Sequence, residues 1–254
     1  MKTFKDKNVL ITGGANGIGK HIAEAFLAQK AKVHILDIDT EKGTALAEAH
    51  ENATFYNCDL SKKTSINSFF KKFGENIGID YIINNAAASK AGLLSSCSWE
   101  DFEYVQRVGV TGPYYISSVA LTKGILSTKS SIVNIASTRA FQSQADTESY
   151  SAAKGAILSL THAMSTSFAG FVRVNSVSPG WIETAEDAKH KPSDLSQHSA
   201  GRVGTPSDVA EMVMFLCDHK KSGFITGQNF VVDGGMSKLM IYHGDKGWEY
   251  NPNE

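Results

Sequence analysis

Tyr150 and Lys154 are the two residues whose types and spacing most directly suggest chemistry. Residues four positions apart on a helix lie on the same face, one turn from each other. A phenol normally titrates near pH ~10, but we expect the Lys154 ammonium to favour the phenolate and to lower the pKa of Tyr150. Ser137 lies thirteen residues upstream, at the end of an apolar run, and could offer a hydroxyl to the same substrate oxygen. Because such Tyr–Lys pairs also occur by chance on exposed helices, the rest of the chain must show what they would act on.

A glycine-rich loop follows the first predicted strand, where residues 12–19 read Thr-Gly-Gly-Ala-Asn-Gly-Ile-Gly. Glycines at a strand-to-helix turn permit tight backbone angles and let the backbone approach a pyrophosphate at the helix N-terminus. We therefore expect Gly13, Asn16, Gly17, Ile18 and Gly19 to bind a dinucleotide.

The same loop nearly matches a second kind of phosphate site. Gly14, Gly19 and Lys20 have the spacing of the phosphate-binding loop of NTPases, but His21 stands where that motif needs a Ser or Thr hydroxyl for Mg²⁺. The sequence therefore favours a dinucleotide over a nucleoside triphosphate.

Asp37 ends the second predicted strand, about twenty residues beyond the glycine loop, where an acidic side chain can bind the ribose hydroxyls of NAD. The same carboxylate would repel the 2′-phosphate of NADP by roughly 4 kcal/mol at ~4 Å and an effective dielectric constant of ~20. The residues after it, Ile38, Asp39 and Thr40, include no arginine to offset that repulsion. We predict NAD(H) as the preferred cofactor and keep NADP(H) as the alternative. A strand-end Asp without a role is the simpler interpretation.

The elements that must position these residues are apolar strand-like runs that alternate with helical patterns along almost the whole chain. Continuous apolar strands joined by helices indicate a parallel sheet covered on both faces, and repeated βα units with right-handed crossovers give a doubly wound fold. We therefore predict one dinucleotide-binding and catalytic domain over residues 1–254, an α/β Rossmann-like fold with a seven-stranded parallel sheet and helices on both faces. The predicted strands are 8–12, 32–37, 54–57, 81–84, 131–136, 172–177 and 229–232, and the predicted helices are 17–29, 41–50, 62–73, 99–123, 150–168 and 206–217.

Two segments depart from this alternation. Residues 185–201 are polar and weakly patterned, which suits either a mobile lid over a site or a plain surface loop. The tail 236–254 carries apolar and aromatic side chains that a free end would leave exposed, so we expect it to pack on its own subunit or on a partner. These side chains are Met240, Ile241, Tyr242, Trp248 and Tyr250.

Composition and charge exclude several classes of protein. The chain has 42% hydrophobic residues, a formal net charge of −1 and no basic block, so neither nucleic acid nor an anionic membrane is an expected partner. No apolar run approaches membrane-spanning length, and no signal-peptide pattern is present. Three widely spaced cysteines (Cys58, Cys97, Cys217) predict reduced thiols and a cytoplasmic location. The eight histidines show no metal-binding spacing, so we predict no metal site.

Four further motifs follow the glycine loop in order: Cys-Asp-Leu at 58–60, Asn-Asn-Ala-Ala at 84–87, Pro-Gly-Trp-Ile-Glu-Thr at 179–184 and Val-Val-Asp-Gly-Gly at 231–235. Together with the residues above, they resemble the short-chain dehydrogenase/reductase family, in its group of single-domain members of this length. Ala87 replaces the glycine that usually ends the second motif. The resemblance implies that Ser137, Tyr150 and Lys154 are catalytic. It implies cofactor contacts from Ile38, Asp59, Leu60, Asn85, Ala86, Ala87, Tyr150, Lys154, Pro179, Gly180, Ile182 and Thr184.

The resemblance also implies an activity, the NAD(P)(H)-dependent interconversion of an alcohol and a carbonyl compound with Tyr150 as the general acid–base. By family position, the residues that border the substrate are Lys90, Arg139, Gln142 and Trp181. The charges of Lys90 and Arg139 suggest a polar or anionic small molecule. Alternatively, Arg139 pairs with Glu148 and never meets substrate. Small residues along the Tyr150 helix suit the helix pairing that gives homodimers or homotetramers in this family, although they also suit packing within one subunit.

One position departs from the family in a way that bears on catalysis. Gly109 stands where the family usually has an asparagine that kinks the helix and holds a water beside the catalytic lysine. A second function therefore stays open, a nucleotide-binding protein with weak or lost catalysis that acts as a redox sensor or a structural subunit.

Overall fold

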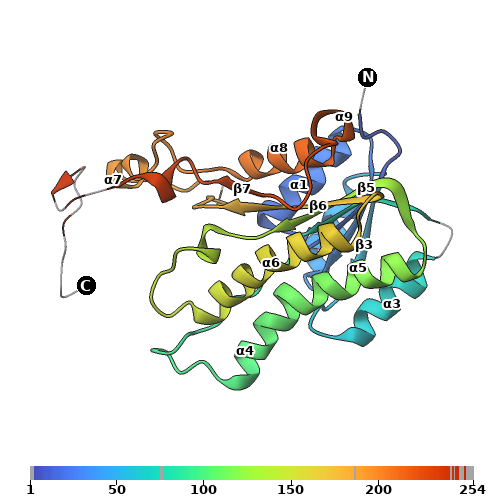
Figure 1. Ribbon diagram of the computed structural model, residues 1–254, viewed down its shortest axis with the longest axis horizontal. Helices are drawn as coiled ribbons and strands as arrows, with labels where there is room; N and C mark the ends of the chain where they lie inside the picture. Colours follow the sequence, from blue (N-terminus) through green and yellow to red (C-terminus); the bar gives the residue numbers. More distant parts are fainter. Residues whose placement is uncertain are drawn as a thin grey trace.

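The computed structural model describes residues 3–74, 77–185, 187–240, 242, 244–245 and 249. Seven strands form one sheet in the order β3-β2-β1-β4-β5-β6-β7, and every neighbouring pair is parallel. This confirms the predicted doubly wound fold (Figure 1). The strands are β1 (Asn8–Thr12), β2 (Lys32–Asp37), β3 (Ala53–Asn57), β4 (Ile79–Asn84), β5 (Leu126–Ile135), β6 (Val172–Pro179) and β7 (Asn229–Val232).

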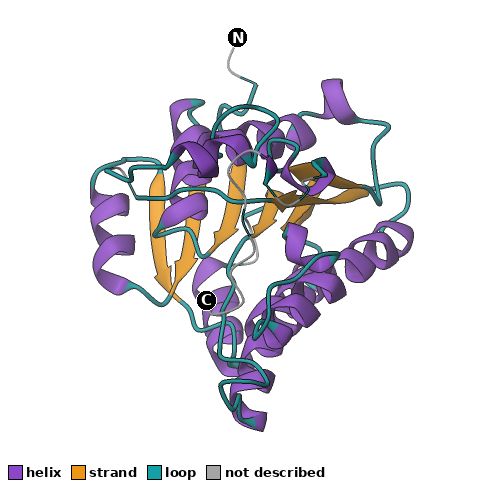
Figure 2. Ribbon diagram, turned by 90° about the vertical axis from the view of Figure 1, so that its left-hand side faces the viewer, coloured by secondary structure: helices purple, strands orange, loops and turns teal. Residues whose placement is uncertain are grey.

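Helices cover both faces of the sheet (Figures 1 and 2). In Figure 1, α1 and α8 lie above the sheet, while α3, α5 and α6 lie below it. None of the described helices is long and apolar enough to cross a membrane. The helices are α1 (Gly17–Ala28), α2 (Thr40–Glu48), α3 (Lys63–Phe73), α4 (Trp99–Gln106), α5 (Gly112–Thr122), α6 (Glu148–Ser167), α7 (Pro192–Ser196), α8 (Pro206–Cys217) and α9 (His219–Ser222), with a π-helical turn at Arg107–Thr111 and 3₁₀ turns at Thr138–Ala140 and Met236–Lys238.

The strands β1 to β6 divide their side chains between two hydrophobic clusters, one on each face of the sheet. On β1, Val9 and Ile11 pack with residues of α1, α2 and α8, whereas Leu10 between them packs with residues of α3, α5 and α6. Successive side chains of a strand point to opposite faces. A strand that is covered on both faces must therefore be apolar throughout, as the predicted parallel sheet requires.

The predicted elements differ from the structure mainly at their ends. β5 begins at Leu126 rather than at the predicted Ser131, and the prediction missed this start because residues 127–129 are polar. α6 begins at Glu148, two residues before the predicted start at Tyr150. The short helices α7 and α9 were not predicted. Helices of five and four residues are too short to show a hydrophobic period.

The segment 185–201 contains α7 and returns to the body of the domain at its C-terminal end. There the Ala200 N–H donates to the Gly234 carbonyl at 2.9 Å, and the His198 side chain is buried. In the tail, Met240 and Tyr242 are exposed. Residues Ile241, Trp248 and Tyr250 lie outside the described residues.

Candidate active site

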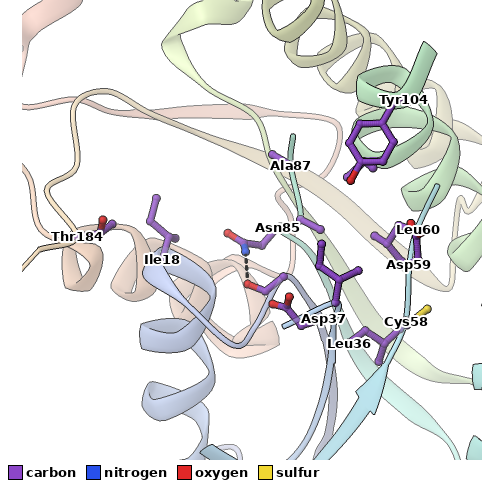
Figure 3. A pocket seen from close by; sticks show the side chains of 14 residues that line it. Ile18, Leu36, Asp37, Cys58, Asp59, Leu60, Asn85, Ala87, Tyr104 and Thr184 are labelled. Carbon is purple, nitrogen blue, oxygen red and sulfur yellow. Dashed lines mark hydrogen bonds between the residues drawn. The ribbon is translucent and has the colours of Figure 1, made fainter. Parts of the chain in front are cut away.

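The carboxyl ends of β1 to β4 open into a cavity of about 380 Å³ (Figure 3). β1 and β4 are neighbours at the place where the strand order reverses, and doubly wound folds bind ligands at this reversal. Ten of the predicted cofactor residues line the cavity: Gly13, Ile18, Asp37, Ile38, Asp59, Leu60, Asn85, Ala86, Ala87 and Thr184.

The glycine loop brings the N-terminus of α1 to this cavity. Gly13 and Gly17 have φ angles of +63° and +51°, which glycine adopts at little steric cost. The Asn16 side chain accepts a hydrogen bond from Gly17 N at 3.0 Å and caps α1. Asn85 Nδ2 donates to the Gly13 carbonyl at 2.9 Å and ties the loop to the end of β4 (Figure 3). The loop therefore places a helix N-terminus, where backbone N–H groups bind phosphates, beside the cavity.

Gly19 lies where the loop and α1 approach most closely. A Cβ at this position would be 2.0 Å from the Gly13 carbonyl oxygen and 2.5 Å from Asn85 Nδ2. We expect Gly19→Ala to lower the free energy of unfolding by about 1–3 kcal/mol, because the loop must move to relieve the overlap. Nucleotide affinity should fall with it. Thermal unfolding and a fluorescence titration with NADH would measure the two effects.

Gly155 on α6 provides a matched control. The nearest atom to a Cβ there is the Ala140 carbonyl oxygen at 3.8 Å, an ordinary contact. Gly155→Ala should leave stability unchanged or raise it by up to ~1 kcal/mol through helix propensity. If Gly19→Ala were as stable as this control and bound nucleotide equally well, the close approach would have no consequence.

Asp37 lies at the end of β2 with its carboxylate at the cavity (Figure 3). Its Oδ2 accepts from the Ala15 N–H at 2.9 Å, and its Oδ1 accepts from the Asp39 N–H at 3.1 Å. These bonds fix the carboxylate against the glycine loop. Asp37 therefore has a structural partner in the loop as well as a position at the cavity, which argues against a strand-end residue without a role.

The three predicted catalytic residues meet at the end of β5. Ser137 lies two residues beyond the end of β5, and Tyr150 and Lys154 lie one turn apart on α6. Ser137 acts on Tyr150 in the direction that lowers the pKa of the phenol. Lys154 is buried, with Nζ donating to the Ile135 carbonyl at 2.7 Å and lying 5.4 Å from the centre of the Tyr150 ring.

The electrostatics of this cluster differ from the sequence-based expectation. Burial, the largest influence, raises the pKa of Tyr150 above its ordinary value, while the Ser137 hydrogen bond and the Arg139 charge act in the lowering direction. Burial also lowers the pKa of Lys154 to about 8. The expected net lowering of the Tyr150 pKa is therefore wrong for this structure, because desolvation by burial is the largest influence on the pKa of each of the two groups.

A chain of buried polar side chains holds α6 against the sheet. Asn84 Nδ2 on β4 donates to Asn134 Oδ1 on β5 at 2.8 Å, and Asn134 Nδ2 donates to Thr161 Oγ1 on α6 at 2.9 Å. These bonds fix α6 relative to β5, the strand that leads to Ser137. Neither Asn134 nor Thr161 was predicted as a site residue, because no local pattern marks residues that meet only in the folded chain.

A second and larger cavity of about 700 Å³ begins at Ser137. Three of the four predicted substrate residues, Arg139, Gln142 and Trp181, line it together with Gly180 and Ile182. The fourth, Lys90, does not. Its ammonium forms an ion pair with Asp101 at 3.2 Å and lies over the ring of Tyr104 at 5.7 Å.

The remaining predicted cofactor residues are not on the lining of the first cavity, and two of them, Gly180 and Ile182, line the second one. Pro179 ends β6, and Gly17 lies beside Thr184, whose methyl group would be 3.6 Å from a Cβ on the glycine. Four lining residues were missed: Leu36, Cys58, Tyr104 and Val108. Leu36 and Cys58 directly precede the predicted cofactor residues Asp37 and Asp59, and this position was the one signal in the sequence that could have identified them. Tyr104 and Val108 look like ordinary helix residues.

Gly109 lies within the π-helical turn between α4 and α5. A Cβ at this position would be 3.2 Å from the Cβ of Ala153, the residue before Lys154. The glycine therefore permits close packing against the catalytic helix, and π-turns often mark functional sites. In the part of the chain that the structure describes, no group of three His, Cys, Asp or Glu side chains could hold a metal ion.

Comparison with known proteins relates this chain to reductases and other oxidoreductases. Residues 13–237 match a family model described as enoyl-(acyl carrier protein) reductase. An uncharacterized oxidoreductase from Thermotoga maritima is 43% identical, with 94% of this chain and 99% of the relative covered. The 3-oxoacyl-[acyl-carrier-protein] reductase FabG of Chlamydia pneumoniae is 33% identical, covering 92% of this chain and 98% of the relative. The structure of an apo SCOR enzyme from Clostridium thermocellum superposes with a TM-score of 0.89 at 40% identity, covering 97% and 99% of the two chains.

Proposed function

Because this chain belongs to the short-chain dehydrogenase/reductase family, as a single-domain oxidoreductase, we propose that it interconverts an alcohol and a carbonyl compound by hydride transfer with NAD(H). The observation that carries the proposal is the cluster at the end of β5, where Ser137 acts on the Tyr150 phenol in the direction that lowers its pKa and Lys154 is buried one turn further along α6. Ser137 lines the 700 Å³ cavity, so a substrate there would meet the Ser137 hydroxyl beside Tyr150.

In the oxidation direction, Tyr150 as the phenolate takes the hydroxyl proton of the alcohol while the carbon loses a hydride. Bound NAD⁺ would supply the hydride acceptor. Ser137 donates a hydrogen bond to the substrate oxygen as its charge changes. Lys154 provides a positive charge one turn from Tyr150 and a group that could bind the nicotinamide ribose. Reduction runs through the same groups in reverse.

The residues of the first cavity fit a dinucleotide. A Cβ at Gly13 would lie 2.8 Å from the Ala86 Cα, so only glycine leaves the loop this close to β4. The N-terminus of α1 suits the pyrophosphate, and Asp37 suits the hydroxyls of an adenosine ribose. The Asp37 carboxylate supports NAD(H) over NADP(H), since it would face the 2′-phosphate of the latter.

The alternative, a nucleotide-binding protein without catalysis, is not favoured, because the relatives that carry a functional name are named for oxidoreductase activity. Gly109 nevertheless offers a direct test. We expect Gly109→Asn to lower kcat/KM by about 2- to 10-fold, since its Cβ would press on Ala153 and shift Lys154, and a small misplacement near the chemistry is costly. Steady-state kinetics would check this, with Gly109→Ala separating the effect of the Cβ from that of the amide. A large gain in activity with asparagine would instead support a protein that lost its catalysis.

Assembly into a homodimer or homotetramer remains part of the proposal. Trp99 and Tyr114 expose large side chains on α4 and α5, which a partner subunit could cover. Ala153, by contrast, is buried inside its own subunit. Sedimentation as a monomer at micromolar concentration would contradict an oligomer. A cytoplasmic location also stays a prediction.

The segment 185–201 is proposed as a lid over the second cavity. Gln197 lines the cavity, and the His190 ring meets the Trp181 ring edge-on at 5.4 Å. The segment therefore forms one wall of the cavity while its end is anchored by Ala200.

A further inference from the structure

Arg139 has the only charged side chain among the eleven residues that line the 700 Å³ cavity. Its guanidinium donates to the Oε1 atom of Gln144, a neutral amide. Arg107 and Arg202, outside this cavity, each form an ion pair with a carboxylate. No carboxylate of the described residues forms an ion pair with Arg139. The cavity therefore presents a cation whose protein partner carries no charge.

The carboxylates nearest in sequence are engaged elsewhere. Glu148, the partner considered from the sequence, accepts a hydrogen bond from Leu93 N at 3.1 Å. Asp146 accepts from Leu94 N at 2.9 Å and from Ser95 N at 3.1 Å. Both acidic side chains thus bind the backbone of the loop that follows β4. The expected alternative, an Arg139–Glu148 ion pair, does not form.

Arg139 is also close to the reacting groups. Its backbone N–H donates to Ser137 Oγ at 3.2 Å, and its side-chain charge acts on Tyr150 in the direction that lowers the pKa of the phenol. Ser137 and Arg139 line the same cavity. A small substrate with its reacting oxygen at Ser137 could therefore reach the guanidinium with a second polar group.

We propose that Arg139 binds a carboxylate of the substrate, so that the enzyme acts on a small hydroxy acid and the corresponding oxo acid. This inference rests on the proposed function and adds the substrate class to it. A planar guanidinium matches a carboxylate with two parallel hydrogen bonds, and an anion is a stronger acceptor than the amide oxygen of Gln144. The carboxylate takes no part in the redox step, which removes the hydroxyl proton and a hydride from the carbinol carbon.

The rest of the lining indicates further hydroxyl groups on the substrate. Gln142, Ser143, Gln144 and Gln197 bring neutral hydrogen-bonding groups to the cavity, and Trp181 adds an aromatic wall. Hydroxyl and amide groups can bind substrate hydroxyls without a net charge. Within the class of hydroxy acids, polyhydroxylated acids such as aldonic acids therefore suit the cavity best.

Matched pairs of substrates test the proposal. An aldonate would be compared with the corresponding alditol, and a short 3-hydroxy acid with its primary amide, each with NAD⁺. We expect the acid to be preferred in each pair. Arg139→Gln should raise KM for the acid by about 10- to 100-fold, the range for hydrogen bonds to charged groups, and should change KM for the neutral partner less than about twofold. Arg139→Lys should recover part of the loss, because it restores the charge without the planar fork.

Lys72, exposed on α3 and outside both cavities, supplies a control of equal charge change. Lys72→Ala should leave KM for the acid and for its neutral partner unchanged, and thermal unfolding would show that every variant folds.

Arg139→Gln should also move the alkaline rise of activity with neutral alcohols to higher pH. Of the charged groups around Tyr150, this variant removes Arg139 and keeps Lys154, so the pKa of the phenol should rise. This shift would report the charge of Arg139 at Tyr150, while the matched substrate pairs report binding of the carboxylate.

Calorimetry of acid binding to the protein saturated with NADH keeps the inference testable apart from turnover. If the acid bound to the wild-type protein and no longer bound to the Arg139→Gln variant, the inference would be supported even without oxidation of any substrate. The lack of oxidation would then overturn the proposed function alone. Turnover of neutral alcohols with no preference for acids, or equal effects of Arg139→Gln on both members of a pair, would overturn the inference and leave the proposed function intact.

Discussion

Tyr150→Phe is expected to lower kcat/KM for alcohol oxidation by about 10²- to 10⁴-fold, the usual contribution of a positioned general acid–base. The substitution removes a single oxygen atom, the one that would take the substrate proton. Packing of the ring should be kept, since the phenol sits on α6 beside Lys154 and Ser137. NADH affinity, measured by fluorescence titration, should change little, because Gly13 and Asp37 line the first cavity and Tyr150 does not.

Tyr114 serves as the matched control for this experiment. It is exposed on α5 and lines neither cavity, so Tyr114→Phe should retain full activity. A folded Tyr150→Phe protein that binds NADH and turns over at the wild-type rate would remove Tyr150 from the mechanism. The pH profile gives a second readout. Burial raises the pKa of Tyr150, so wild-type oxidation should increase as the pH rises through alkaline values, where the phenolate forms.

Asp37→Asn is expected to change the ratio of kcat/KM for NADP⁺ to that for NAD⁺ by about 10²- to 10³-fold in favour of NADP⁺. The carboxylate and a 2′-phosphate charge at ~4 Å repel by roughly 4 kcal/mol, and each ~1.4 kcal/mol corresponds to a factor of ten. Asparagine removes the charge and keeps a side-chain carbonyl that can still accept from Ala15 N. Initial rates with the two cofactors at a fixed substrate concentration would measure the change.

Asp39→Asn removes the same charge two residues later and is the matched control. Asp39 caps α2 by accepting from Lys42 N at 3.0 Å and does not line the cavity. Asparagine is also a good N-cap, so this variant should keep both stability and cofactor preference. If Asp37→Asn left the preference unchanged, or if the wild-type protein favoured NADP⁺, the assignment of Asp37 to the ribose would be wrong.

Much of the fold was predictable because its signals are local. Buried parallel strands must be apolar on both faces, and β1, β2 and β7 were predicted with their observed bounds. Strand ends are harder where polar residues begin a strand. The first five residues of β5 include Ser127, Thr128 and Lys129, which look like a loop although they continue the strand.

The candidate site was predictable where spacing along one element decides position. The interval from Tyr150 to Lys154 is one helical turn, so the pair shares a face whatever the rest of the chain does. Backbone requirements are equally local, since the glycine loop needs left-handed angles at Gly13 and Gly17. From these features alone, the sequence determined the tight glycine turn before α1, the shared helix face of Tyr150 and Lys154, and the class of fold.

The tertiary structure decided the properties that depend on which residues meet across the chain. The direction of the Tyr150 pKa shift follows from burial, which is a product of packing and not of spacing. Lys90 and Arg139 looked equivalent as cations near the catalytic serine. Folding pairs Lys90 with Asp101 and leaves Arg139 with an amide, because Asp146 and Glu148 turn to the loop after β4. A charge can be assigned to a substrate only once its possible partners in the protein have been placed.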